Sequence, residues 1–158
     1  MYPVYKFIGS ETVCREVNIA FPPQHQDCMP GLEYLMSPRP ISENPYYNPS
    51  NKLKDKVAII TGGDSGIGRA VAYLYAKEGA DISIAYYPTD EKDALETKCR
   101  VEEIGRRCVL TPCDLTIPES SQQVVKNTMD AFCKIDILVN NCAVQYIQND
   151  FLDISIEQ

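Results

Sequence analysis

The sequence predicts an α/β protein whose core is a doubly wound sheet of parallel strands with helices on both faces. The first observation is a strand-like run at residues 56–60 (KVAII), apolar after its first residue, that leads through the glycine-rich segment 61–68 (TGGDSGIG) into a helical pattern. The second is that apolar runs and helical patterns then alternate as far as residue 140. Such alternation gives parallel strands joined by right-handed crossovers. We expect a sheet that is truncated after its fourth strand, with a proline-rich arm before it.

The first 55 residues are expected to form an extended arm, and residues 56–158 an incomplete domain. Residues 1–55 contain eight of the eleven prolines and seven aromatic residues. Proline fixes φ and removes a backbone donor, which disfavours regular structure. The aromatic side chains suggest that parts of the arm lie on the surface of the domain, and a disordered leader is the alternative.

The segment 61–68 has the features of a dinucleotide-binding turn between a strand and a helix. Gly62 permits a tight turn, Gly66 lets phosphate oxygens approach the backbone, and Gly68 allows close packing. Unpaired amides at the start of the helix, together with its dipole, attract an anion. A P-loop is excluded because the Gly-Lys pair that it requires is absent at positions 67 and 68. The motif therefore predicts a Rossmann-like fold that binds a dinucleotide.

The first helix follows this segment and is expected to end at Gly79. The side expected to be buried contains four apolar residues and one acid, namely Ile67, Ala70, Val71, Leu74 and Glu78. Tyr73 points away from the centre of that side and is interpreted as a surface tyrosine. Residues 81–87 then form the second strand, which Pro88 stops.

A second helix is expected over residues 90–104, and a third short strand over residues 108–113. The inner face of that helix includes Ala94, Thr97, Val101 and Ile104. Thr116, with Glu119 three residues later and a proline in the first turn, predicts the start of a third helix. The apolar side of the third helix carries Val124, Val125, Thr128, Met129 and Phe132. Residues 135–140 are expected to form the fourth strand.

Several motifs occur along the chain in the order found in one enzyme family. The segment 61–68 matches T-G-x-x-x-G-I-G, and Asp114 and Leu115 match an Asp-Leu pair after the third strand. Residues 140–143 (NNCA) correspond to N-N-A-G, with small residues kept but the glycine lost. These motifs resemble those of the short-chain dehydrogenases/reductases. The arm motifs QHQ at 24–26 and PGLE at 30–33, with Met36, Pro38 and Pro40, are similar to those of the glucose/ribitol-dehydrogenase-like branch.

The resemblance implies an NAD(P)-binding Rossmann domain and an oxidoreductase that moves hydride between nicotinamide and an alcohol/carbonyl pair. The cofactor-binding residues that it implies are Gly62, Asp64, Ser65, Gly66, Ile67, Gly68, Tyr86, Tyr87, Asp114, Leu115, Asn140 and Ala143. The choice between NAD and NADP stays open, because Tyr86 and Tyr87 stand where an acid or an arginine would decide it. A methyltransferase is disfavoured by the glycine spacing and by the two asparagines after the fourth strand.

The resemblance also implies that no catalytic residue lies in this chain. In the family a Ser and a Tyr-x-x-x-Lys pair follow the fourth strand at some distance, with the Tyr as acid/base. The Tyr73/Lys77 and Tyr2/Lys6 pairs match the Tyr-x-x-x-Lys spacing, but they are interpreted as non-catalytic. Residues 155–158 (SIEQ) have the pattern of a helix start, so we expect an N-terminal fragment with negligible dehydrogenase activity. The alternative is a complete, non-catalytic dinucleotide-binding module that acts through subunit association.

The composition of the chain limits the classes of partner that we expect it to bind. A formal net charge of −7 over 158 residues argues against a nucleic-acid partner, and no apolar run approaches the roughly 18 residues of a membrane span. Seven cysteines without a C-x-x-C pair, and one histidine, predict reduced thiols and no metal site. Cys108, Cys113 and Cys142 are expected to be buried. We therefore expect a cytoplasmic protein with a small alcohol or carbonyl substrate, which is a homo-oligomer when full length.

Overall fold

The computed structural model describes residues 23, 25–27 and 31–143. The helix start expected at residues 155–158 and the Tyr2/Lys6 pair lie outside these residues. The elements in chain order are η1 (Glu33–Leu35), β1 (Val57–Thr61), α1 (Gly66–Lys77), β2 (Asp81–Tyr86), η2 (Pro88–Asp90), α2 (Glu91–Glu103), β3 (Cys108–Pro112), α3 (Pro118–Phe132) and β4 (Ile137–Val139). The expected strands and helices of this region are present, with ends shifted by one or two residues.

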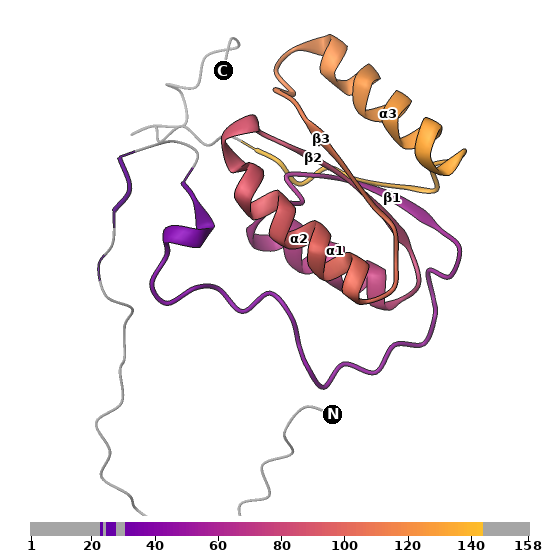
Figure 1. Ribbon diagram of the computed structural model, residues 1–158, viewed down its shortest axis with the longest axis horizontal. Helices are drawn as coiled ribbons and strands as arrows, with labels where there is room; N and C mark the ends of the chain where they lie inside the picture. Colours follow the sequence, from indigo (N-terminus) through magenta and orange to yellow (C-terminus); the bar gives the residue numbers. More distant parts are fainter. Residues whose placement is uncertain (1–22, 24, 28–30, 144–158) are drawn as a thin grey trace, which may run out of the picture.

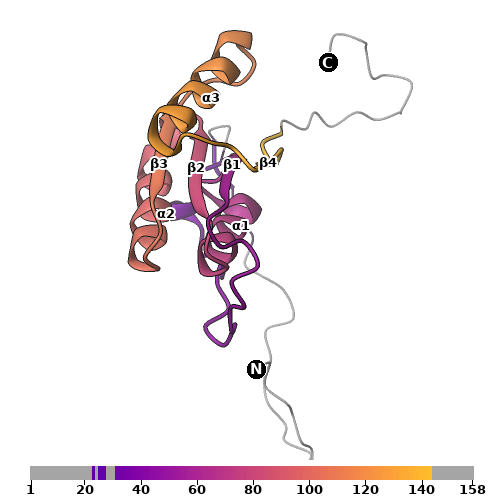
Figure 2. The same cartoon turned by 90° about the vertical axis from the view of Figure 1, so that its right-hand side faces the viewer.

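The four strands form one parallel sheet in the order β3-β2-β1-β4 (Figure 2). Ala58 of β1 is in register with Ile82 of β2 on one side and with Ile137 of β4 on the other. Strands β1 and β2 are buried along their whole length, as central strands covered on both faces must be.

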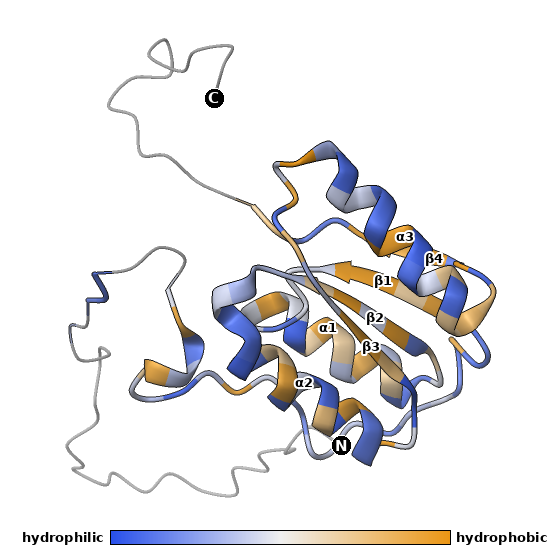
Figure 3. Cartoon of the chain, turned by 45° about the horizontal axis from the view of Figure 1, so that its top comes forward, coloured by the Kyte–Doolittle hydropathy of each residue, from blue (hydrophilic) through white to orange (hydrophobic). Residues whose placement is uncertain are grey.

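Helices cover both faces of this sheet. Ile60 and Ile84 belong to the larger core, which includes residues of α1 and α2. The smaller core joins Ile59 of β1 to Val124 of α3. Figure 1 shows α1 and α2 side by side with α3 apart from them, and Figure 3 shows apolar strands between helices with hydrophilic outer sides. The predicted doubly wound α/β class is confirmed.

Strand β4 is shorter than expected and forms one edge of the described sheet. A backbone bond from Asp136 N–H to the carbonyl oxygen of Val57 (2.9 Å) is matched by a side-chain bond, in which the Asp136 carboxylate accepts from Val57 N–H at 2.9 Å. The ladder therefore starts only at Ile137. Leu138, in the middle of the strand, is 58% exposed.

The buried side of helix α1 overlaps only in part with the one expected: Val71 packs against the core and Glu78, just after the helix, is buried, but the two largest apolar residues of that side are not. Ile67 is 78% exposed and Leu74 is 41% exposed, whereas Tyr73 is only 7% exposed, so the interpretation of Tyr73 as a surface residue is wrong. The buried residues of the helix are Gly68, Arg69, Ala72, Tyr73 and Ala76. The alanines allow close packing, and the guanidinium of Arg69 can be buried because carboxylates pair with it.

Helix α3 does not begin with the expected capping box. The residue before its first turn is Ile117, and no side chain caps that turn. Thr116 instead donates its N–H and its hydroxyl to the Asp114 carboxylate at 2.9 and 2.7 Å, a turn that Asp favours. Val125 and Met129, expected on the apolar side, are exposed, and the buried residues are Val124, Thr128 and Phe132.

Parts of the arm segment 31–55 contact α1 and α2, and the segment runs along their side of the domain (Figure 1). Lys92 of α2 stands 3.8 Å from the centre of the Tyr34 ring. Further along, the buried carboxylate of Glu78 after α1 accepts from the Tyr47 hydroxyl and, at 2.8 Å, from Lys52 N–H. A cation–π contact and hydrogen bonds thus hold this part of the arm to the domain.

Glu43 makes the arm's attachment dependent on pH. Its carboxylate bonds to Arg100 of α2 at 2.8 Å and pairs with Lys77 of α1 at 2.6 Å. Arg100, aided by Lys77, lowers the pKa of Glu43 from 4.5 to about 2. A depressed pKa stabilises the folded state above pH 4.5, and this contribution is lost as the pH falls from 4.5 towards 2.

We therefore expect Glu43→Gln to lower the free energy of unfolding at pH 7 and to lose this effect as the pH falls towards 2. Urea unfolding of both proteins, followed by circular dichroism between pH 7 and pH 2.5, measures the difference. Glu119→Gln, which alters an exposed carboxylate of α3, controls for the loss of one negative charge. A difference that stays constant below pH 4.5 would contradict the assignment.

Candidate functional site

The loop between β1 and α1 forms the centre of the candidate site. Gly62 has φ of +63° and Gly66 has φ of +52°, left-handed conformations that favour glycine. A Cβ on Gly68 would lie 2.0 Å from the carbonyl oxygen of Gly62. The tight turn and the close packing expected of these glycines are confirmed, although Gly68 approaches the loop carbonyl rather than the strand itself.

The first turn of α1 offers free amides to a ligand. In the part of the chain that the structure describes, the backbone N–H groups of Ile67 and Gly68 have no hydrogen-bond partner. A Cβ on Gly66 would meet nothing within 4 Å, so the surface beside the turn is open. Amides of this kind, at the positive end of a helix, are suited to an anion.

Thr61 and Asn141 join the glycine loop to the segment after β4, and neither was among the predicted site residues. The Asn141 side chain donates to the carbonyl oxygens of Thr61 and Gly62, each at 3.0 Å. The Thr61 hydroxyl accepts from the N–H groups of Asn141 and Cys142 at 2.9 and 3.1 Å. The second asparagine of the NN pair was the signal for this brace, because its amide can satisfy loop carbonyls that the strands leave free.

Arg69 braces the loop from the other side and was also missed. Its Nε donates to the carbonyl oxygen of Asp64 at 2.8 Å, and one Nη donates to the Asp93 carboxylate of α2 at 3.0 Å. Its other Nη pairs with Glu33 of the arm at 2.6 Å. No local pattern indicates these contacts, since they join three separate parts of the chain.

Six further predicted residues lie at or after the carboxyl ends of β2, β3 and β4, on the same side of the sheet as the glycine loop. Tyr86 ends β2 and is buried, whereas Tyr87 beside it is exposed. Asp114 and Leu115, after β3, are partly buried, and Asn140 and Ala143, after β4, are exposed. A contact of any of them with a cofactor stays a prediction.

Acidic side chains stand close to the loop. Asp64 and Asp90 are both buried, and burial raises the pKa of each carboxyl. Burial likewise raises the pKa of the Tyr86 hydroxyl. Buried acids near the end of β2 are a setting in which the ribose end of a dinucleotide is commonly recognised.

The cysteines differ from expectation at two positions. Cys108 is buried, and burial raises the pKa of its thiol to about 12. Cys113 is only partly buried, and Cys142 is exposed, because the segment after β4 lies beside the open loop rather than under a helix. Among the described residues, no three His, Cys, Asp or Glu side chains are grouped so that they could hold a metal ion.

A match to a family model assigns the chain to a protein family. The model, described as short chain dehydrogenase, matches residues 56–158, the region that holds the glycine loop, the sheet and Asn141. The chain belongs to the short-chain dehydrogenase family. The resemblance inferred from the sequence motifs is thereby confirmed.

Relatives within the short-chain dehydrogenase family are similar in sequence to most of this chain. It is 55% identical over 136 residues to an uncharacterized oxidoreductase, YhdF, of Bacillus subtilis, covering 86% of this chain and 47% of the relative. It is 46% identical over 142 residues to a glucose and ribitol dehydrogenase homolog of Oryza sativa, covering 85% and 47%. It is 44% identical over 128 residues to NADPH-dependent aldehyde reductase 1 of Arabidopsis thaliana, covering 78% and 44%. The chain spans about half the length of these relatives.

Solved structures of family members share the fold. Carveol dehydrogenase from Mycobacterium avium, in complex with NAD, superposes with a TM-score of 0.62 at 28% identity, covering 68% of this chain and 43% of that one. The short-chain dehydrogenase from Mycobacterium paratuberculosis, bound to NAD, does so with a TM-score of 0.59 at 34% identity, covering 67% and 43%.

The Tyr73/Lys77 pair does not have the surroundings of the family's acid/base pair. Tyr73 is buried in the larger core, and burial raises the pKa of its hydroxyl, whereas an acid/base tyrosine needs a lowered pKa and access to substrate. Lys77 pairs with Glu43 at 2.6 Å. Tyr73 therefore packs in the core, and Lys77 anchors the arm to the domain.

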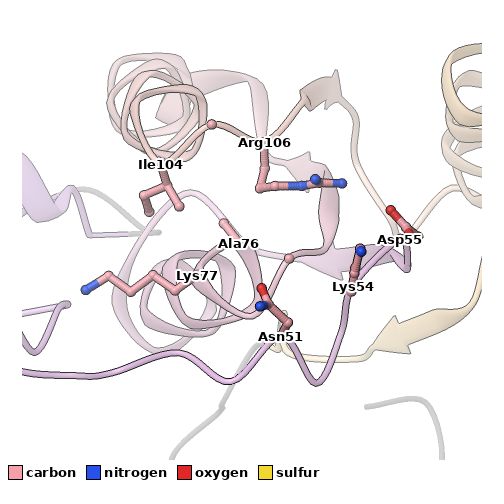
Figure 4. A pocket seen from close by; sticks show the side chains of 9 residues that line it. Asn51, Lys54, Asp55, Ala76, Lys77, Ile104 and Arg106 are labelled. Atoms are coloured by element: carbon pink, nitrogen blue, oxygen red, sulfur yellow. The ribbon is translucent and has the colours of Figure 1, made fainter.

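A cavity of about 450 Å³ lies at the amino ends of the strands, opposite the glycine loop, where α1 and α2 end (Figure 4). Figure 4 shows Lys77 and Arg106 extending to opposite sides of it. Lys77 is paired with Glu43, and Arg106 pairs with Asp81 at 2.9 Å. Two of the three lining cations are thus already paired, Lys54 being the third, and the cavity is lined by the end of α1 rather than by the amides of its first turn.

Proposed function

We propose that residues 56–158 bind NAD or NADP as the cofactor domain of an oxidoreductase acting on an alcohol/carbonyl pair, with residues 1–55 as an arm on its surface. The single observation that carries this proposal is the first turn of α1, where the amides of Ile67 and Gly68 are free beside a loop shaped by Gly62, Gly66 and Gly68. When bound, the cofactor would supply the hydride chemistry.

The residues present fit such a cofactor. The diphosphate would accept from the free amides on the open side of the turn, where a Cβ on Gly66 would meet nothing within 4 Å. Asp64, Ser65, Tyr86 and Tyr87 would border the ribose, Asp114 and Leu115 the adenine, and Asn140 and Ala143 the middle of the cofactor. The complex of carveol dehydrogenase with NAD and the NADPH dependence named for the Arabidopsis relative support both forms as candidates.

We further propose that this chain by itself does not turn over substrate. The hydroxyl of Tyr73 is buried and Lys77 is engaged by Glu43, so the one described Tyr-x-x-x-Lys pair is unsuited to acid/base catalysis. The longer protein would take a small alcohol or carbonyl substrate, form a homo-oligomer and work in the cytoplasm. None of the helices in the described ranges has the length and apolar character of a membrane span.

Calorimetry with NAD, NADP and S-adenosylmethionine tests this function directly. We expect saturable binding of at least one of the two dinucleotides, no binding of S-adenosylmethionine, and no oxidation of NADPH or NADH with a panel of aldehydes and sugars. A folded sample that binds neither dinucleotide would refute the cofactor assignment. Turnover by this chain would refute the proposed inactivity and, with it, the non-catalytic module as an alternative.

A further inference from the structure

The arm places a carboxylate against the first turn of α1. Glu33 Oε2 accepts from the N–H of Gly66 at 2.5 Å, and Oε1 accepts from Arg69 Nη1 at 2.6 Å. The Glu33 side chain is 5% exposed and that of Arg69 is 3% exposed. Two elements separated by more than 30 residues in sequence are thus joined at the loop that the proposed function assigns to the diphosphate.

The contact of Glu33 with Arg69 and Gly66 helps to fix the glycine loop at two points. Arg69, which Glu33 holds, donates to the carbonyl oxygen of Asp64 at 2.8 Å, and the hydroxyl of Thr97 in α2 donates to the same oxygen at 2.8 Å. Glu33 itself holds the amide of Gly66 two residues later. The loop is therefore held at Asp64 and Gly66, while the next amides stay free in the described structure.

The arm segment that carries Glu33 is itself anchored. The side-chain amide of Gln26 brackets Leu32, donating to its carbonyl oxygen at 2.9 Å and accepting from its N–H at 2.8 Å. Arg39, beyond η1, bonds to Glu96 of α2 at 3.1 Å. Glu33 thus reaches the loop from an anchored turn, which makes a lasting brace more consistent with the geometry than a carboxylate that leaves when ligand arrives.

We propose that Glu33 is a positioning residue for the dinucleotide site: it holds the Gly66 amide and Arg69 so that the amides of Ile67 and Gly68 face the diphosphate. The inference rests on the proposed function, because it assigns Glu33 a role in the same site. Fixing a loop before the ligand arrives removes an ordering cost from binding. Loss of a charge-assisted hydrogen bond at such a site is expected to weaken binding about tenfold to a hundredfold.

The test compares Glu33→Ala, Glu33→Gln and Glu43→Gln in the 158-residue chain by calorimetry with NAD and NADP. Glu43 is the matched control, since it anchors the same arm to Lys77 and Arg100 without touching the loop. We expect Glu33→Ala to raise Kd about tenfold or more, Glu33→Gln to raise it less because its amide oxygen can still accept from Gly66, and Glu43→Gln to change it by less than about twofold.

A second readout separates positioning from general stability. In protein labelled with ¹⁵N-glycine, the Gly66 amide proton is expected to move upfield in both Glu33 variants and to stay in place in Glu43→Gln, because a bond to a carboxylate deshields that proton. Equal weakening by Glu33→Ala and Glu43→Gln, an unchanged Kd, or tighter binding by the Glu33 variants would overturn the proposal. Wild-type protein that is folded but binds neither dinucleotide would instead refute the proposed function, and this inference with it.

Discussion

Replacing Gly68 with alanine is expected to destabilise the protein by about 3 kcal/mol or more and to abolish dinucleotide binding. The added Cβ would lie 2.0 Å from the carbonyl oxygen of Gly62 and 2.7 Å from Nδ2 of Asn141. Both neighbours belong to the brace between the loop and the segment after β4, so relief of the clash must move the loop itself. Urea unfolding and calorimetry with NAD and NADP measure the two effects.

Gly66→Ala is the matched comparison for Gly68→Ala. Gly66 needs a left-handed backbone, but a Cβ there would meet nothing within 4 Å. The expected cost is therefore only the backbone strain of about 1–2 kcal/mol, without displacement of Asn141. If the two substitutions cost the same free energy, close packing at Gly68 is not what shapes the loop.

Arg69→Met is expected to lower the free energy of unfolding by about 3–5 kcal/mol, because it removes the buried cation that bonds to both Glu33 and Asp93 and leaves them, in the described structure, only the longer pairs with Arg39, at 3.7 and 3.8 Å. Arg69 is 3% exposed and pairs with Glu33 at 2.6 Å and with Asp93, itself 1% exposed, at 3.0 Å. The substitution also removes one of the two hydrogen bonds to the carbonyl oxygen of Asp64 and leaves the one from the Thr97 hydroxyl. Chemical unfolding followed by circular dichroism provides the measurement.

Two further variants give this prediction its controls. Arg69→Lys keeps the charge but not the planar fork, and is expected to fall between wild type and Arg69→Met. Lys126→Met removes a cation that is 68% exposed and pairs with Asp130 within α3, and should change stability by no more than about 0.5 kcal/mol. An effect of Arg69→Met as small as that of Lys126→Met would show that the buried pairs contribute little.

The sheet and the glycine loop could be predicted because their signals are local. Four apolar runs between helical patterns specify parallel strands, and the spacing of Gly62, Gly66 and Gly68 specifies a turn that other residues adopt only at a cost in free energy. The positions of Thr97 and Val101 on the inner face of α2 were likewise correct, since the pattern of that helix contains few competing apolar residues.

The buried side of α1 could not be predicted from its apolar residues. Arg69 is buried because Glu33 and Asp93, from two other parts of the chain, pair with it, and such partners are invisible to periodicity. The start of α3 failed for a similar reason, since the Asp114 carboxylate competes successfully for Thr116. The brace at Asn141 was missed because its function depends on where β4 lies beside β1.

The placement of β4 beside β1 also bears on the order in which the molecule assembles. Val57 and Asp136, which meet at the start of that pairing, are 79 residues apart, whereas Asp81 and Arg107, across β2 and β3, are 26 apart. Closing the longer stretch costs more chain entropy, so β4 is expected to dock last. Nucleotide binding would then become possible only after the final step of folding. Pulse-labelled hydrogen exchange should show that the amides of β4 become protected after those of β2.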